Sequence, residues 1–227
     1  MTTHQELTGG SDEELRDRML RTHESRFNDS YWAVVNQHVV PRLPTTPTIV
    51  DLGCGPGLFL RDASQRIPGA KLYGFDLTPA MVEHARKLEY AGDPPELGAL
   101  DVLKQPIPLP ESSMDAVFMS AVLHLFDDPF TFLCNLRGVM KPTGTFVLYD
   151  WVRISLADYL NRALRDAVAD PIAERQRQMK LFAAHNRYTA EDWRWVLGEA
   201  GFDIVADEAP AAKWFRVFVA TPKGAGR

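Results

Sequence analysis

Short apolar segments alternate with amphipathic segments along the chain from Thr48 onward. Apolar runs of roughly four to eight residues predict buried strands, and the longer segments between them have the periodicity of helices. Strands that alternate with helices of about ten or more residues form parallel βαβ units. We therefore expect an α/β fold with a Rossmann-like, doubly wound, mostly parallel sheet and helices on both faces. The expected parallel strands are TIVDL, KLYGFDL, LGALDV, MDAVFMSAV and TFVLYDW.

This alternation pauses after Trp151, where a helical stretch precedes a last pair of strands. Residues 156–186 predict two arginine-rich helices, and their mixed charges favour a solvated face over a nucleic-acid patch. The segments 202–209 and 213–222 predict two antiparallel strands. The complete sheet is therefore expected to have seven strands, including an antiparallel closing strand.

Helical segments outside the sheet divide the chain. The N-terminal part contains a polar helix from about Asp12 to Ser25 and a second helix that ends before Pro41, because proline disfavours helix in the preceding residue. We expect an N-terminal helical lid over residues 1–46. We expect the core over residues 47–227, with a helical insertion at about 151–188.

Composition and charge disfavour several classes of protein. The chain has 227 residues, of which 45% are hydrophobic and 24% are charged, as in ordinary soluble domains. Its formal net charge of −5 disfavours a nucleic-acid partner. Two cysteines outside any CxxC pair exclude a disulfide framework, and no apolar run approaches the length of a membrane span. We expect a cytoplasmic protein without nucleic-acid or membrane partners.

A glycine-rich loop follows the first strand of the core. In VDLGCGPG, Gly53, Gly55 and Gly57 lie between a buried strand and a helix. Glycine allows positive φ and close approach of a ligand, and the helix N-terminus offers free N–H groups. The spacing G-x-G-x-G differs from the dinucleotide fingerprint G-x-G-x-x-G, and no P-loop pattern is present. The loop therefore indicates a nucleotide-like ligand.

Three aspartates end successive predicted strands. Asp51 precedes the glycine loop, where its charge would oppose a pyrophosphate and favour a ligand with positive groups. Asp76 lies where a carboxylate can accept both hydroxyls of a ribose, and Asp101 lies where it can accept from an exocyclic amine. Because ligands bind outside the carboxyl ends of parallel strands, we expect these side chains to share one crevice.

These motifs together resemble those of the class I S-adenosylmethionine-dependent methyltransferases, in particular the small-molecule type. The resemblance covers about residues 48–150 and rests on VDLGCGPG, GFDLTPAMV, ALDV, MDAVFMSAVLHLF and KPTGTFVLYD. It implies S-adenosyl-L-methionine as cofactor and a methyl group moved by in-line displacement to a small-molecule acceptor.

The resemblance also implies roles for individual residues in the crevice. Asp51 would support the methionine ammonium beside the glycine loop, and Asp76 would hold the ribose. Plain core packing remains an alternative for the apolar members, and a strand-end cap remains one for Asp51 and Asp101. The implied cofactor-binding residues are Asp51, Gly53, Gly55, Gly57, Asp76, Leu77, Met81, Asp101, Val102 and Ser120.

Catalytic and acceptor-binding candidates lie outside these motifs. His124, just beyond the fourth strand, has the pKa range of a general base, although it could instead hydrogen-bond the loop around it. The N-terminal helix and the insertion would close a dry pocket, and aromatic walls would suit an apolar or cationic acceptor. The expected acceptor-binding residues are Tyr31, Trp32, Trp151 and Arg153, the last of which could pair a carboxylate.

Missing motifs disfavour other kinds of methyltransferase. The [DN]-P-P-[YF] motif of DNA amine methylation is replaced by residues 120–123, and Cys134 lacks the proline that precedes a cytosine-methylating cysteine. Asp150-Trp151 stands where catechol-type enzymes have a metal-binding Asp-Asn pair, so we expect no metal. A non-catalytic cofactor-binding relative, a protein side-chain methyltransferase and a nicotinamide oxidoreductase remain alternatives, and the acceptor and oligomeric state stay open.

Overall fold

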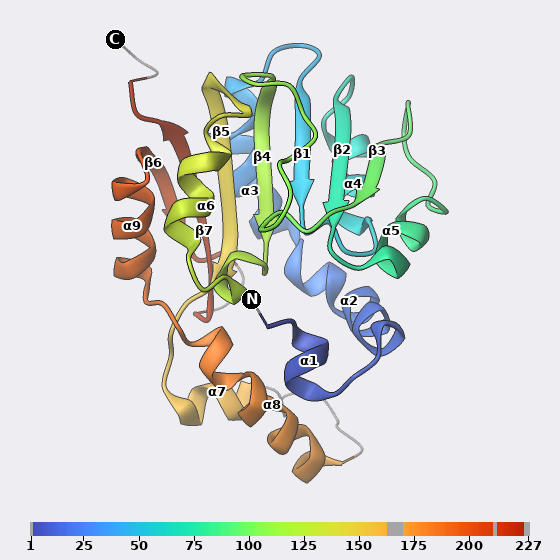
Figure 1. Ribbon diagram of the computed structural model, residues 1–227, viewed down its shortest axis with the longest axis vertical. Helices are drawn as coiled ribbons and strands as arrows, with labels where there is room; N and C mark the ends of the chain where they lie inside the picture. The colour runs from blue at the N-terminus through green and yellow to red at the C-terminus, as the bar shows by residue number, and fades with distance from the viewer. Residues whose placement is uncertain (1, 163–169, 211–212, 225–227) are drawn as a thin grey trace.

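The computed structural model describes residues 2–162, 170–210 and 213–224, which form a seven-stranded sheet with helices on both faces (Figure 1). The α/β fold expected from the alternation is confirmed. The strands are β1 (Thr48–Leu52), β2 (Lys71–Asp76), β3 (Glu96–Ala99), β4 (Met114–Ser120), β5 (Met140–Trp151), β6 (Phe202–Glu208) and β7 (Phe215–Pro222). The helices are α1 (His4–Thr8), α2 (Asp12–Arg26), α3 (Asp29–His38), α4 (Leu58–Arg66), α5 (Pro79–Ala85), α6 (Pro129–Leu136), α7 (Leu156–Arg162), α8 (Pro171–His185) and α9 (Ala190–Glu199), with 3₁₀ turns at Val40–Arg42 and Leu123–Leu125.

The strand order is β3-β2-β1-β4-β5-β7-β6. β1 pairs in parallel with both β2 and β4, so the order reverses between β1 and β4. β7 runs antiparallel between β5 and β6 and is the expected closing strand. In open α/β sheets, ligands bind outside the carboxyl ends of the strands at such a reversal. The topology therefore places a binding crevice after β1, β2 and β4.

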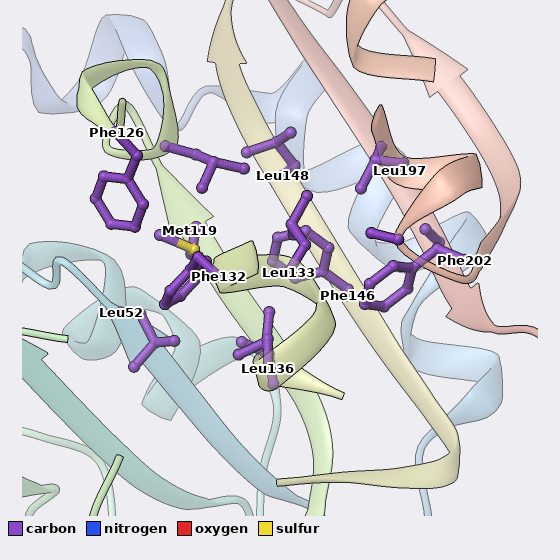
Figure 2. Packing of buried hydrophobic residues seen from close by; sticks show 14 of the residues in the cluster. Leu52, Met119, Phe126, Phe132, Leu133, Leu136, Phe146, Leu148, Leu197 and Phe202 are labelled. Atoms are coloured by element: carbon purple, nitrogen blue, oxygen red, sulfur yellow. The ribbon is translucent and has the colours of Figure 1, made fainter. Parts of the chain in front are cut away.

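Both faces of the central strands are buried. Successive side chains of a strand point to opposite faces. In β4, Val117 and Met119 pack in the layer that contains α6 and α9, whereas Ala116 and Phe118 pack in the layer with α3 and α4. Figure 2 shows part of the first layer, where Leu133 of α6 lies among the side chains of the central strands. Burial on both faces explains why these strands are apolar throughout.

Four helices gather beyond the carboxyl ends of the parallel strands: α1 and α2 from the N-terminal part, and α7 and α8 from the insertion (Figure 1). α2 begins with a capping box, in which the Ser11 hydroxyl accepts from the Glu14 N–H and the Glu14 carboxylate accepts from the Ser11 N–H. The predicted arginine-rich helices are α7 and α8, and residues 163–169 between them lie outside the described residues. α3 instead packs in the core, with Tyr31 and Trp32 buried.

Some element boundaries differ from the sequence prediction. β3 ends at Ala99 rather than Val102, because the backbone at Asp101 enters a turn in which its carbonyl accepts from the Lys104 and Gln105 N–H groups. α5 ends at Ala85, and α1 was not expected at all. Within the described ranges, no helix has both the length and the apolar character needed to cross a membrane.

Candidate active site

The glycine loop joins β1 to α4 at the reversal of strand order. Its three glycines have positive φ, at +78° for Gly53, +52° for Gly55 and +83° for Gly57. A Cβ on Gly53 would lie 2.3 Å from Cγ2 of Val122, so a side chain cannot fit there without displacing the loop after β4. The Gly53 and Cys54 N–H groups donate to the carbonyl of Phe75. These contacts hold the loop beside the end of β2.

Asp76 ties the glycine loop to the start of α5. Its Oδ2 accepts from the Gly55 N–H at 2.8 Å, and its Oδ1 accepts from the Thr78 N–H at 2.8 Å. Burial raises the pKa of Asp76, although these backbone hydrogen bonds oppose the shift. A carboxylate oxygen has two lone pairs, so each oxygen can accept one further hydrogen bond from a bound hydroxyl.

Asp51 lies near the end of β1, is almost entirely buried, and forms no ion pair with any described residue. Burial, together with the charge of Asp76, raises the pKa of Asp51 to about 8. Asp51 Oδ1 and the neighbouring Ser120 Oγ are buried with no hydrogen-bond partner in the described part of the chain. Both line one small pocket with Gly53 and Gly55. Buried acceptors of this kind are costly unless a donor arrives, and a bound ammonium group supplies one.

The opposite end of the crevice is mainly apolar. Met81 and Val102 line it together with Leu77, which is partly exposed. Asp101 also lines it, although it lies in the turn after β3, where its Oδ1 accepts from the Leu103 N–H at 3.1 Å. Flat apolar contacts and an edge acceptor suit a purine base. Gly57 lines neither pocket and serves as the N-cap of α4.

A larger cavity of about 750 Å³ adjoins the crevice and lies beneath the helices α1, α2 and α8, called the lid helices below. Residues from α1 and α2 line both spaces, namely His4, Gln5, Leu15 and Met19. Ala121, after β4, also faces both. The remaining walls of the cavity come mainly from the insertion helices and from the end of β5. A group held in the crevice can therefore be presented directly to an occupant of the cavity.

Among the described residues, four arginines line this cavity: Arg18, Arg26, Arg162 and Arg177. Arg177 is paired with Glu174. The guanidinium groups of Arg18 and Arg26 have no ion-pair or hydrogen-bond partner among the described residues, and burial lowers the pKa of both. Arg26 also lines the pocket beside Asp51.

The Arg162 guanidinium stacks over the rings of Trp151 and Tyr159, with its Cζ 4.4 and 4.2 Å from their centroids. One of its amino groups donates to Gln178 Oε1 at 2.8 Å. A cation therefore already occupies the aromatic wall, so the cavity presents excess positive charge to an occupant. This differs from the apolar or cationic acceptor that the aromatic residues led us to expect.

His124 lies within a cluster of histidines beside the cavity. The ring Nδ1 of His124 is 2.6 Å from Oδ1 of Asp150, and the backbone N–H of His124 donates to Oδ2 of the same carboxylate. Its Nε2 faces Nε2 of His4, which in turn faces Nε2 of His185. Burial lowers the pKa of His4 to about 3 and that of His185 well below its usual value, and nearby His124 adds to both shifts. His4 and His185 are therefore neutral at physiological pH.

The expected acceptor-binding residues lie in different environments. Trp151 lines the cavity and stacks on His185. Tyr31 and Trp32 are buried in the aromatic layer around Phe59 and line none of these spaces, although Asp51 is near enough to Tyr31 to raise the pKa of its hydroxyl further above its usual range. Arg153 donates to backbone carbonyls at 186–187 and does not line the cavity.

The comparisons with known proteins agree with this geometry. Residues 50–148 match a family model described as a methyltransferase domain. A malonyl-[acyl-carrier protein] O-methyltransferase of Hahella chejuensis is 29% identical over 99 residues, which cover 44% of this chain and 34% of that protein. A trans-aconitate 2-methyltransferase of Methylobacterium radiotolerans is 34% identical over 120 residues, which cover 53% of this chain and 43% of that protein. Residues 50–148 are therefore similar to the methyltransferase domain of the S-adenosylmethionine-dependent methyltransferases.

The fold likeness extends beyond the matched domain. A crystal structure of a SAM dependent methyltransferase from Aquifex aeolicus superposes with a TM-score of 0.67, covering 94% of this chain and 99% of that one at 21% identity. By contrast, the chain spans less than half the length of the two curated relatives. The methyltransferase fold is therefore shared over almost the whole chain.

The residues present fit the family's cofactor, S-adenosylmethionine. The two buried acceptors without donors, Asp51 Oδ1 and Ser120 Oγ, lie where an ammonium group can donate to them. Gly53 has no side chain, so its backbone lines the pocket beside Asp51 and Ser120 and can be approached closely by a ligand. Each carboxylate oxygen of Asp76 accepts one backbone hydrogen bond, from Gly55 or from Thr78, and retains a lone pair for a ribose hydroxyl. Among the described residues, no lysine or arginine lines the part of the crevice around Asp76 and Asp101.

Proposed function

We propose that this protein transfers the methyl group of S-adenosylmethionine to an anionic small molecule, most simply to an oxygen of a carboxylate. The observation that carries the proposal is the set of cavity arginines, of which Arg18 and Arg26 have no ion-pair or hydrogen-bond partner among the described residues. Both side chains are partly buried, and a cation removed from water is unfavourable unless an anion neutralises it. An acceptor with a carboxylate would do so.

The mechanism that follows from this arrangement needs little acid–base chemistry. When bound, S-adenosylmethionine supplies an activated methyl group on a positively charged sulfur. Arg18 and Arg26 would bind and orient the acceptor, and alignment of this kind can supply up to roughly 7–11 kcal/mol of the barrier reduction. The helices α1 and α2 would exclude water from the junction of crevice and cavity. A carboxylate is already ionised, so its oxygen needs no general base before it attacks the methyl carbon.

The names of the curated relatives support an acidic acceptor. The two relatives described above are named for malonyl and trans-aconitate methylation, and both chemical groups carry carboxylates. The family-model match covers residues 50–148, whereas the cavity arginines lie outside this range. The sign of the cavity charge is therefore an independent argument for the same class of acceptor.

The test is a methyl-transfer assay on acceptors that share one carbon skeleton and differ in charge. Dicarboxylic acids, their amides and the matching amines would be incubated with the protein and S-adenosylmethionine, and formation of S-adenosylhomocysteine would be measured. We expect turnover with the acids and little with the amides or amines. A preference for the amines would contradict the proposal.

A pair of variants on one helix face tests the role of the arginines. Removing a charged hydrogen-bond partner costs about 1.5–3 kcal/mol, so Arg18→Gln should raise KM for an acid by roughly 10- to 150-fold. Arg21→Gln is the matched control, because Arg21 is an exposed arginine of the same helix and does not line the cavity. Equal effects of the two substitutions would remove Arg18 from the acceptor site.

The same assay separates the alternative functions. A non-catalytic relative would bind S-adenosylhomocysteine but yield no methylated product with any acceptor or cell extract. A protein methyltransferase would label a protein band from the extract and leave the small acids unmodified. A nicotinamide oxidoreductase would bind NAD(H) and not S-adenosylhomocysteine. We favour the small-molecule enzyme because the cavity lies beneath the lid helices and is lined by opposing elements.

A further inference from the structure

Three histidines from distant parts of the chain meet at the edge of the acceptor cavity. His4 comes from α1, His124 from the 3₁₀ turn after β4, and His185 from the end of α8. One ring nitrogen of each histidine lies within 4.8 Å of the corresponding nitrogens of the other two. Nε2 of His4 is 2.9 Å from Nε2 of His185 and 3.4 Å from Nε2 of His124. Proposed methyl transfer to a carboxylate uses none of these rings as a base.

Hydrogen bonding alone does not satisfy this cluster. The Asp150 carboxylate only accepts, so Nδ1 of His124 carries its proton and Nε2 of a neutral ring presents a lone pair. The single N–H of a neutral His4 ring can point at only one of its two neighbours. The contact of His4 Nε2 with either His124 Nε2 or His185 Nε2 therefore has no proton between the two nitrogens. A cation placed between the three nitrogens would interact favourably with all of them.

The spacing matches the coordination shell of a small transition-metal ion. Zinc binds histidine nitrogen at about 2.0–2.1 Å, and two ligands in a tetrahedral shell are then about 3.3 Å apart. The distances from Nε2 of His4 to Nε2 of His185 and of His124, 2.9 and 3.4 Å, bracket this value. Three neutral imidazoles suit zinc and its neighbours in the first transition row, whereas calcium and magnesium prefer oxygen ligands.

We propose that His4, His124 and His185 form a binding site for a divalent transition metal of the zinc class, bound through their Nε2 atoms. Three protein ligands leave one position of a tetrahedral shell open, as in catalytic rather than structural zinc sites. His4 and His185 line the cavity, so an occupant of the cavity can reach this position.

The surroundings of the cluster orient its rings. Metal-binding histidines usually form a hydrogen bond through their second nitrogen, which fixes the ring and its tautomer. Nδ1 of His124 contacts Asp150 and Nδ1 of His185 contacts the hydroxyl of Tyr159, each at 2.6 Å. The indole of Trp151 stacks on His185 at 4.1 Å between centroids. These contacts leave Nε2 of both rings facing the common centre.

A metal at this place has a chemical use in the proposed reaction. An oxygen of an anionic acceptor is a suitable fourth ligand, and its binding would fix one end of the acceptor while the arginines hold the other. This role in acceptor binding rests on the proposed function. The metal site itself does not, because it depends only on the three histidines and their hydrogen-bonded neighbours.

The test uses the tag-free, full-length protein, freed of metal with a chelator and titrated with Co²⁺ in the absence of cofactor and acceptor. We expect one equivalent to bind with the visible absorption of cobalt in a four- or five-coordinate nitrogen site, and Zn²⁺ to displace it. Absence of saturable binding, or the spectrum of hexa-aqua cobalt, would overturn the proposal. Failure of methyl transfer to acids would leave this result unaffected.

Variants identify the ligands while keeping the fold. His4 is partly buried on a five-residue helix without core residues, so His4→Gln should change the thermal melt little and lower Co²⁺ affinity by at least tenfold. Tyr159→Phe removes only the neighbour of His185 and should weaken binding by about 10–100-fold. His38→Gln is the matched control outside the cluster and should bind as the wild type does. Unchanged affinity in both His4→Gln and Tyr159→Phe would refute the assignment.

Discussion

At the scale of residues, the cofactor crevice depends on carboxylates that serve both the fold and the ligand. Asp76 accepts hydrogen bonds from backbone N–H groups of two different loops, and its remaining lone pairs face the crevice. Oδ1 of Asp51 accepts no hydrogen bond from any described residue, so a bound ligand can donate to it. The first residue is therefore already partly satisfied in the free protein, whereas the second is stabilised only on binding.

Asp76→Asn should weaken binding of S-adenosylhomocysteine by roughly 10- to 150-fold, because hydroxyl groups would lose a charged acceptor worth about 1.5–3 kcal/mol. Titration calorimetry measures this loss. Asp93→Asn, at an exposed turn outside the crevice, is the control. Equal affinities of the Asp76→Asn and wild-type proteins would show that the ribose binds elsewhere.

Binding of S-adenosylhomocysteine near pH 7 should release almost one proton from Asp51. Burial and the charge of Asp76 raise the pKa of Asp51 to about 8 in the free protein, where Tyr31 and Cys54 are its other titratable neighbours. A bound ammonium would lower this pKa and expel the proton. Calorimetry in buffers of different ionisation enthalpy measures the release, and Asp51→Asn should abolish it. Equal proton release in both proteins would contradict this assignment.

The same pKa shift predicts how the stability of the free protein depends on pH. A carboxyl whose pKa is raised on folding holds its proton more tightly in the native state than in the unfolded chain. The contribution of Asp51 to stability is therefore greatest below its ordinary pKa of 3.8 and is lost as pH rises toward 8. Asp51→Asn should accordingly raise the melting temperature more at pH 8 than at pH 5.

Gly53→Ala tests the close approach at the glycine loop. Positive φ costs an alanine about 1–2 kcal/mol, and the clash with Val122 adds about 1–3 kcal/mol of overpacking. Gly92→Ala is a matched control, because Gly92 has φ +84° and open space around its Cβ position. We expect a larger fall in melting temperature for Gly53→Ala, partly restored by Val122→Ala. Equal falls for the two glycine variants would show that the Val122 contact is unimportant.

Sequence patterns located the carboxylates and, in the cavity, Trp151, but not the cavity's arginines and histidines. Asp51 and Asp76 follow apolar strands directly, so their places at the carboxyl edge follow from local pattern. His4, Arg18 and His185 lie in polar helical segments, and nothing local indicates which face of such a helix meets the cavity. Their functional placement depends on contacts between segments distant in sequence. The sequence shows the positions of His4 and His185 but does not show that the two side chains meet in the folded protein.

At the scale of elements, strands were predicted more accurately than the lid. Apolar runs bounded by turn residues define β1, β2, β4 and β5, and a capping box formed by Thr189 and Asp192 begins α9. α1 has five residues and no apolar periodicity, so its sequence carries little helical signal. It is held instead by its own capping box and by contacts with α8, including that between His4 and His185.

Removal of residues 2–10 should separate closure of the site from stability of the fold. No residue of α1 is buried, and Ser11 would remain to cap α2. We expect the melting temperature to fall by less than about 4 °C, the shift that roughly 1 kcal/mol produces in a domain of this size. Turnover should fall at least tenfold, as removal of His4 and Gln5 opens both spaces to water. Retained turnover would show that α1 does not close the site.

At the scale of the whole molecule, the sign of charge differs between surface and cavity. The chain carries a formal net charge of −5, yet four arginines line the space beneath its lid. Net charge therefore says little about the acceptor, and the composition could not have predicted an anionic one. The fold places the negative crevice and the positive cavity side by side, with Arg26 lining both the cavity and the pocket beside Asp51.

This juxtaposition is tested most directly by a crystal structure of the protein with S-adenosylhomocysteine and a dicarboxylate that it methylates. We expect the ammonium of the ligand at Asp51, its sulfur facing the cavity beside Met19 and Ala121, and a carboxylate paired with Arg18 or Arg26. A sulfur that faces away from the cavity, or a dicarboxylate bound outside it, would contradict the account.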